Sequence, residues 1–93
     1  MDFEFYRNFI TVAETGNLTT ASKKLALAQP ALSAQIKTLE HYYGAKLIQT
    51  ARGKRQLTLT EAGEAFLGKA RQICHTEETI LLDMQSFNKK ASG

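Results

Sequence analysis

The sequence predicts a mainly α-helical fold: a winged helix-turn-helix of three helices and a short β-hairpin, followed by one long helix. Apolar residues between 18 and 39 form two sets with helical spacing, and a break at Gln29-Pro30 separates them. Two strand-like runs flank a basic turn within 45–59. From Phe66 onward, apolar residues recur at intervals of seven, which is typical of a long helix. The length of 93 residues suits one small domain.

A first helix is expected from about Phe3 to Thr15. Phe5, Phe9 and Val12 lie on one helical stripe, and this broad apolar face suits the base of a small three-helix core. Gly16 follows, and glycine readily adopts the left-handed conformation that ends a helix. The first helix is therefore expected to stop at this glycine.

The helix-turn-helix is expected at about 18–37. Asn17 can cap its first helix, which should end near Ala26, because the asparagine side chain can accept a free backbone N–H. The second helix is expected to begin near Gln29-Pro30, since proline is favoured in a first turn, and to stop at Gly44. The buried faces are expected to consist of Leu18, Ala21, Leu25 and Leu27, and of Leu32, Ile36 and Leu39.

The wing of the fold is expected at about 46–59, where Leu47-Ile48 and Leu57-Thr58-Leu59 are typical of two short strands. Between them lies a turn that contains glycine and three basic residues, Arg52, Lys54 and Arg55. Such a cationic tip can lie on a phosphate backbone or enter a minor groove. The alternative is an exposed loop whose charges serve solubility alone.

Segment 61–93 is expected to form a linker and dimerisation helix after a domain made of residues 1–60. Thr60 can cap this helix, which should continue to about Asn88 before a polar, frayed tail. Apolar residues form two rows with a spacing of seven residues along this helix: one has Phe66, Ile73, Ile80 and Phe87, and the other has Leu67, Cys74 and Leu81. These two rows exceed what a core built from residues 1–60 can cover, which favours pairing with a second copy. The alternative is that the helix folds back on its own domain. The predicted dimerisation residues are Phe66, Leu67, Ala70, Ile73, Cys74, Ile80, Leu81, Met84 and Phe87.

Charge is distributed unevenly, although the net charge is only +3. From Lys23 to Arg55 the chain has seven basic residues and one acidic residue, Glu40, whereas from Glu61 to Asp83 it has five acidic and two basic residues. The first segment suits a phosphate-rich partner and the second does not. Lysines on solvated helix faces can also mean only solubility, so the helix-turn-helix pattern carries more weight than charge.

Several segments resemble one protein family residue by residue. Segment 9–19 is F-I-T-V-A-E-T-G-N-L-T, against a family pattern F-x-x-V-A-E-x-G-S-F-T, and segment 21–25 is A-S-K-K-L, against A-A-x-x-L. Segment 29–40 is Q-P-A-L-S-A-Q-I-K-T-L-E, against Q-P-A-L-S-x-Q-I-x-x-L-E, and segment 59–63 is L-T-E-A-G, against L-T-x-A-G. Over about residues 3 to 73 the chain therefore resembles the N-terminal domain of the LysR-type transcriptional regulators.

This resemblance implies a sequence-specific DNA-binding module of a bacterial transcriptional regulator. The implied partner is double-stranded DNA at a promoter operator, bound by a homodimer through the final helix, with a tetramer possible in the full-length regulator. Such a dimer would place two recognition helices against two half-sites. A small-molecule effector is expected only on a larger C-terminal domain, and no cofactor or metal is expected here.

DNA contacts are expected mainly at the start of the second helix of the helix-turn-helix, the end that enters the major groove. Gln29 can pair with adenine through two hydrogen bonds, Ser33 can bond a base edge or a phosphate, and Lys37 can meet a phosphate. The predicted DNA-binding residues are Thr19, Thr20, Ala28, Gln29, Pro30, Ala31, Ser33, Ala34, Lys37, Arg52, Lys54 and Arg55.

The chain departs from the family pattern at three places. Ala28 stands where many members have serine, so a helix cap worth about 1 kcal/mol is missing. Ala34 stands where many have arginine, which removes a guanidinium able to bind a base or a phosphate. The usual L-F-x-R is replaced by the segment 47–50, L-I-Q-T, which predicts a slightly longer hairpin. We expect a different operator preference or heavier reliance on the wing.

Two other function classes compete with DNA binding. The basic face can instead meet an acidic protein, which would make the chain a winged-helix interaction module without DNA readout. An enzyme is not expected, because Cys74 and His75 diverge by about 100° on a helix and His41 is too isolated to complete a metal site. A single cysteine, the lack of an apolar run of about 18 residues and the acidic start predict a cytoplasmic protein without a membrane partner.

Overall fold

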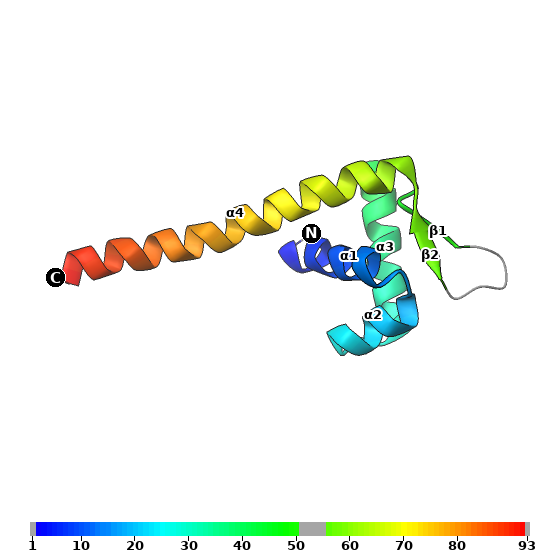
Figure 1. Cartoon of the computed structure of the whole chain (residues 1–93), viewed down its shortest axis with the longest axis horizontal. Helices are drawn as coiled ribbons and strands as arrows, with labels where there is room; N and C mark the ends of the chain where they lie inside the picture. Colours follow the sequence, from blue (N-terminus) through cyan, green and yellow to red (C-terminus); the bar gives the residue numbers. More distant parts are fainter. Residues whose placement is uncertain (1, 51–55, 93) are drawn as a thin grey trace.

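The computed structural model describes residues 2–50 and 56–92. Within these ranges the elements follow in the order α1 (Phe3–Thr15), α2 (Leu18–Leu25), α3 (Gln29–Tyr43), β1 (Ile48–Thr50), β2 (Leu57–Leu59) and α4 (Glu61–Ser92). Figure 1 shows α1, α2 and α3 on one side of α4, with the hairpin at one end of the molecule and the C-terminal end of α4 at the other. The predicted fold class, a winged helix-turn-helix with a long final helix, is confirmed.

The hydrophobic core lies where the first three helices meet, and the apolar stripes predicted for these helices face it. Some predicted members are only partly buried against the core: Phe5, Leu18, Leu25 and Leu27. The core consists of Phe9 and Val12 of α1, Ala21 of α2, Leu32, Ile36 and Leu39 of α3, and Leu47 and Leu57 at the base of the hairpin. Phe66 and Leu67 of α4 pack against this cluster. The start of α4 therefore belongs to the same packed unit as the helix-turn-helix, and burial of this shared apolar surface stabilises both.

The predicted helix caps are confirmed by hydrogen bonds and backbone angles. Gly16 ends α1 in a left-handed conformation, with φ of 65°. The Asn17 side chain accepts the backbone N–H of Thr20 at 3.0 Å and so caps α2. Thr60 caps α4, because its hydroxyl oxygen accepts the N–H of Gly63 at 2.9 Å. These local bonds fix where the chain turns, and they thereby set how the helices enter the core.

The two strands of the hairpin are antiparallel, and Ile48 lies opposite Leu59. Their short length follows from the sequence, because the apolar residues that pack against the core are confined to these runs. The predicted basic tip falls at 51–55, outside the described residues.

The final helix is longer than predicted. It continues to Ser92, whereas a frayed tail was expected from Asn88. The prediction was wrong because polar composition alone does not end a helix, and residues 88–92 include neither glycine nor proline.

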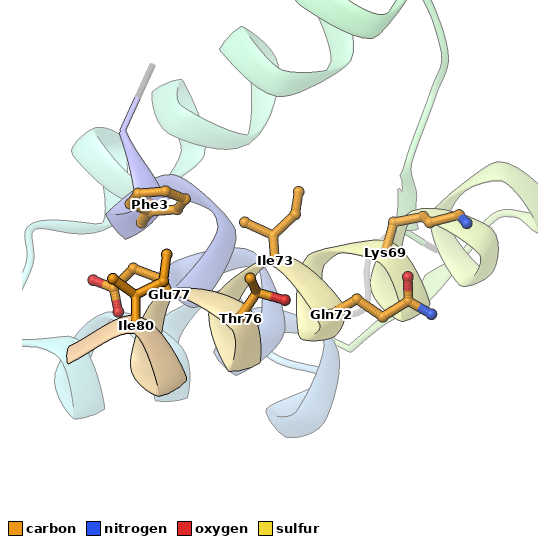
Figure 2. A pocket seen from close by; sticks show the side chains of 7 residues that line it. All are labelled: Phe3, Lys69, Gln72, Ile73, Thr76, Glu77 and Ile80. Carbon is orange, nitrogen blue, oxygen red and sulfur yellow. The ribbon is translucent and has the colours of Figure 1, made fainter. Parts of the chain in front are cut away.

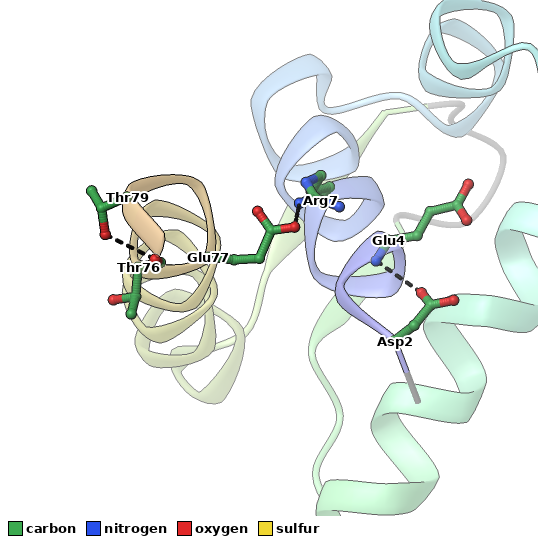
Figure 3. A network of polar contacts seen from close by, with 6 residues as sticks. All are labelled: Asp2, Glu4, Arg7, Thr76, Glu77 and Thr79. Carbon is green, nitrogen blue, oxygen red and sulfur yellow. Dashed lines mark hydrogen bonds and ion pairs between the residues drawn. The ribbon is translucent and has the colours of Figure 1, made fainter. Parts of the chain in front are cut away.

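The first half of α4 lies along α1. The ring of Phe66 meets Phe9 edge to face, with centroids 4.9 Å apart. Further along, Cys74 is buried, and Arg7 Nη2 pairs with Glu77 Oε1 at 2.7 Å, as Figure 3 shows. This ion pair is the last of these contacts along α4, and the helix then extends away from α1 (Figure 1).

An apolar groove lies between the start of α1 and the middle of α4. Figure 2 shows Phe3 of α1 facing α4, with Ile73 beside it and Ile80 further along. Lys69, Gln72, Thr76 and Glu77 complete its lining. The groove therefore marks the boundary between the half of α4 that packs on α1 and the half that does not.

Candidate nucleic-acid interface

The turn between α2 and α3 is tight because one residue takes a left-handed conformation. Ala26 has φ of 55°, which is unusual for a residue with a Cβ, and the N–H of Leu27 donates to the carbonyl of Ser22 at 3.0 Å. Ala28 makes no side-chain cap to α3, in agreement with the prediction, and Pro30 occupies its first turn. Helix α3 therefore begins abruptly, directly after the turn.

The start of α3 presents an exposed face opposite its buried one. Leu32, Ile36 and Leu39 point into the core, so the other side of the helix is left for a partner. The predicted contacts Ala28, Gln29, Pro30, Ala31, Ala34 and Lys37 are exposed, and Ser33 is partly exposed. No described part of the chain covers this face.

The start of α2 lies beside the start of α3. The hydroxyl of Thr19 donates to Oε1 of Gln29 at 3.2 Å, so two predicted contacts from different helices touch. Thr20 is exposed in the first turn of α2, whose cap is Asn17. The two threonines and the first residues of α3 therefore lie on a shared surface.

A groove between α3 and β1 extends this surface toward the hairpin. It is lined by Leu18, Ser33, Ile36, Lys37, Glu40, Lys46, Ile48 and Thr50. Lys46 and Thr50 were not among the predicted contacts, and the only sequence signal for them is a lysine and a hydroxyl beside the expected strand. Because Lys37 and Lys46 both line the groove, their charges favour an anion such as a phosphate there.

Glu40 holds the hairpin against α3. Its Oε2 accepts the backbone N–H of Leu47 at 2.8 Å and that of Ile48 at 3.4 Å. Hydrogen bonds to a charged acceptor are stronger than neutral ones, so this carboxylate fixes the start of β1. Glu40 is the single acidic residue between Lys23 and Arg55, and it keeps β1 in the position that forms one wall of the groove.

The base of the wing is also tied to the turn before α2. The N–H of Leu57 donates to the carbonyl of Gly16 at 2.9 Å, and Gln56 forms an isolated antiparallel bridge with Asn17. The wing residues that were predicted to touch DNA, Arg52, Lys54 and Arg55, lie outside the described residues, and their contacts stay predictions.

The residues predicted for dimerisation fall into two environments. Ala70 and Cys74 are buried within the subunit, and Phe66 and Leu67 pack on its core. These four residues therefore pack against their own domain, which was the alternative to pairing with a second copy. Ile73 is partly exposed in the groove beside Phe3. The exposed members are Ile80, Leu81, Met84 and Phe87, and Leu82, which was not predicted, is exposed as well.

Two aspects of the chemistry bear on other functions. Burial raises the pKa of the Cys74 thiol, which disfavours the reactive thiolate. His75 beside it is exposed, and no three side chains suited to hold a metal gather anywhere in 2–50 or 56–92. Over the same ranges, no helix combines the length and apolar character needed to cross a membrane.

Comparison with known proteins assigns the chain to a family. The family model described as "Bacterial regulatory helix-turn-helix protein, lysR family" matches residues 3–64. The chain is 40% identical over 93 residues to the HTH-type transcriptional regulator BsdA of Bacillus subtilis, covering all of this chain and 32% of that protein. It is 42% identical over 82 residues to the Hca operon transcriptional activator HcaR of Escherichia coli, covering 88% of this chain and 27% of that protein. The chain thus spans about a third or less of these relatives.

Solved structures give the same assignment. The chain from the crystal structure of a CbnR_DBD–DNA complex is 35% identical, with a TM-score of 0.86, over 92% of this chain and 97% of that one. The chain from a BenM_DBD/benA site 1 DNA complex is 31% identical, with a TM-score of 0.85, over 94% and 99% of the two chains. The two relatives named above, BsdA and HcaR, are described as regulators of transcription and not as enzymes. The chain belongs to the lysR family of bacterial regulatory helix-turn-helix proteins, and it corresponds to their DNA-binding domain.

Proposed function

We propose that this chain binds double-stranded DNA sequence-specifically, at a promoter operator, as the DNA-reading part of a transcriptional regulator. The observation that carries the proposal is the exposed start of α3, where Gln29, Pro30, Ala31 and Ala34 face away from the core. A helix with one buried and one exposed face, held at its start by a tight turn, suits insertion into the major groove.

The exposed residues divide by their chemistry into base contacts and phosphate contacts. Gln29 offers both a donor and an acceptor and can discriminate between bases, whereas Pro30 and Ala31 can contact only apolar groups such as a thymine methyl. Lys37 and Lys46, which line the groove beside β1, suit backbone phosphates. The proposal assigns specificity to the start of α3 and general affinity to the lysines.

The partner proposed for the far half of α4 is a second copy of the chain. Exposed apolar side chains follow one another there, with Leu81 61% and Phe87 62% exposed, and the exposed Ile80 also lines the apolar groove that contains Phe3 and Ile73. Two copies paired through this surface would form a symmetric dimer that presents two α3 helices to two half-sites.

Three further parts of the proposal concern the partner, a small-molecule effector and the place of action. The two solved complexes named above, with CbnR_DBD and BenM_DBD, contain DNA, which supports DNA as the partner here. A small-molecule effector would bind a further domain, outside the third of the relatives that this chain matches. The bacterial cytoplasm, where the chromosome lies, is the place of action that goes with this proposal.

Selection from a pool of random duplexes tests the proposal directly. Purified protein is mixed with duplexes that carry a 30-base-pair random segment, and the bound molecules are sequenced after several rounds. The expected result is enrichment of an interrupted palindrome. Retention of duplexes without any enriched sequence would contradict base readout, and no retention at moderate salt would favour the alternative, a protein-interaction module.

A further inference from the structure

The surface at the start of α3 contains a hydrogen bond that bears on base selection. Thr19, the second residue of α2, donates its hydroxyl hydrogen to Oε1 of Gln29, the first residue of α3, at 3.2 Å. We infer that Thr19 is a positioning residue, which orients the amide of Gln29 and thereby determines which base this amide selects. The inference rests on the proposed function and deepens it.

The threonine is held firmly enough to act as a reference point. It sits in the first turn of α2, where Asn17 caps the helix through the N–H of Thr20 at 3.0 Å. The carbonyl of Thr19 also accepts a hydrogen bond from the Ser22 hydroxyl at 2.8 Å. Its β-branched side chain has few rotamers, so its hydroxyl has a defined position. Gln29, by contrast, is exposed and would otherwise sample several rotamers.

The direction of the hydrogen bond decides what the glutamine can offer. An unrestrained amide can turn over and exchange its donor and acceptor ends. When Oε1 accepts from Thr19, it keeps one further lone pair, and both N–H groups of Nε2 remain free. The amide then presents its donor and its acceptor in a fixed order, and adenine requires such an order at N7 and N6.

The same bond disfavours a different role for Thr19. A hydroxyl has only one hydrogen, so a hydroxyl that donates to Gln29 has none left to donate to a phosphate oxygen. A threonine in the first turn of a helix is otherwise well placed for a phosphate bound at the helix N-terminus. The geometry gives it an indirect part in base readout.

The test compares base preferences in the random-duplex selection described above. Thr19→Val keeps the branched shape and removes the hydroxyl, Thr19→Ser keeps the hydroxyl, and Thr11→Val removes a hydroxyl that bonds only the carbonyl of Arg7 on α1. We expect Thr19→Val to reduce the preference at one position of each half-site at least about threefold, with the other positions unchanged. Thr19→Ser and Thr11→Val should retain the wild-type preference.

Two outcomes would overturn the inference. One is an unchanged preference in Thr19→Val, with thermal unfolding confirming that the variant is folded; Thr19→Ala then repeats the test if valine perturbs α2. The other is that Thr19→Val weakens binding to all duplexes equally, and does so even when it is combined with Gln29→Ala. A residue that acts only by positioning Gln29 has no effect once the Gln29 side chain is removed. If the wild-type protein enriches no sequence at all, the proposed function itself fails.

Discussion

The two halves of α4 share one helix and one seven-residue apolar spacing, but they have different surroundings. In 61–77, Phe66 packs on the domain core and Cys74 is buried, whereas in 78–92 the apolar residues Leu81 and Phe87 are exposed. Periodicity therefore identifies the apolar face of a helix without identifying what covers it. Here α1 covers the first half, and a second copy is proposed to cover the other.

The largest effect is expected from a methyl group at the start of α4. In Gly63→Ala the added Cβ would lie 2.0 Å from the carbonyl oxygen of Leu47, so the backbone of the hairpin or of α4 would have to shift. We expect the free energy of unfolding to fall by more than about 3 kcal/mol, above the usual range for overpacking, because the obstructing atoms belong to the backbone. Urea denaturation measures it. Gly68→Ala is the matched control: among the described residues, nothing beyond the adjacent residues and the backbone of its own helix lies within 4 Å of the added Cβ, and a gain of up to about 1 kcal/mol is expected.

The next effect separates the two halves directly. Phe66→Ala removes a ring that contacts Tyr6, Phe9 and Tyr43, and should lower the free energy of unfolding by about 3 kcal/mol. Phe87→Ala removes an exposed ring and should leave the unfolding of the isolated subunit nearly unchanged. Denaturation at several protein concentrations separates subunit stability from dimerisation. Equal losses in both variants at the lowest concentration would contradict the division of α4.

A charge on the far half should act on association and not on folding. In Leu81→Glu a carboxylate replaces an exposed leucine on the proposed dimer surface. We expect the dimer dissociation constant, measured by analytical ultracentrifugation, to rise at least about tenfold, because a buried interface does not tolerate an unpaired charge. An unchanged dissociation constant would mean that the dimer uses another surface. Asp83→Lys is not a suitable control, because it changes a charge on the same half of α4.

The smallest effect concerns a tyrosine that packs against the first half of α4. A hydrogen bond with the Tyr6 hydroxyl, at 2.5 Å, and partial burial raise the pKa of Tyr43 to about 12. The folded state therefore favours protonated Tyr43. The resulting stabilisation of the fold is present below about pH 10 and is lost as pH rises to about 12. Absorbance at 295 nm should show a tyrosine that ionises near pH 12, and Tyr43→Phe should remove that step.

Local features of the fold could be predicted from the sequence because their causes are local. Gly16, Asn17 and Thr60 act on backbone groups within a few residues, so a cap can be identified from a short segment. The buried stripe of α3 is equally local, since Leu32 and Ile36 are one turn apart. The exposed start of α3 followed from the same pattern.

Contacts between distant segments could not be predicted in the same way. The ion pair of Arg7 with Glu77 and the hydrogen bond of Thr19 with Gln29 depend on how two helices cross. The burial of Cys74 likewise requires α1 to lie along α4, which the seven-residue spacing does not reveal. Lys46 belongs to the candidate interface because Glu40 holds the start of the hairpin beside α3, which the sequence does not reveal.

Binding of Gln29→Ala to DNA shows whether the exposed start of α3 distinguishes bases. Fluorescence anisotropy over a salt series would compare a selected duplex with a random one, with Lys37→Ala as the phosphate-contact comparison. We predict that Gln29→Ala weakens binding to the selected duplex by about tenfold and leaves random-duplex binding unchanged, whereas Lys37→Ala weakens both and flattens the salt dependence. Equal losses on both duplexes for Gln29→Ala would mean that the start of α3 does not distinguish bases.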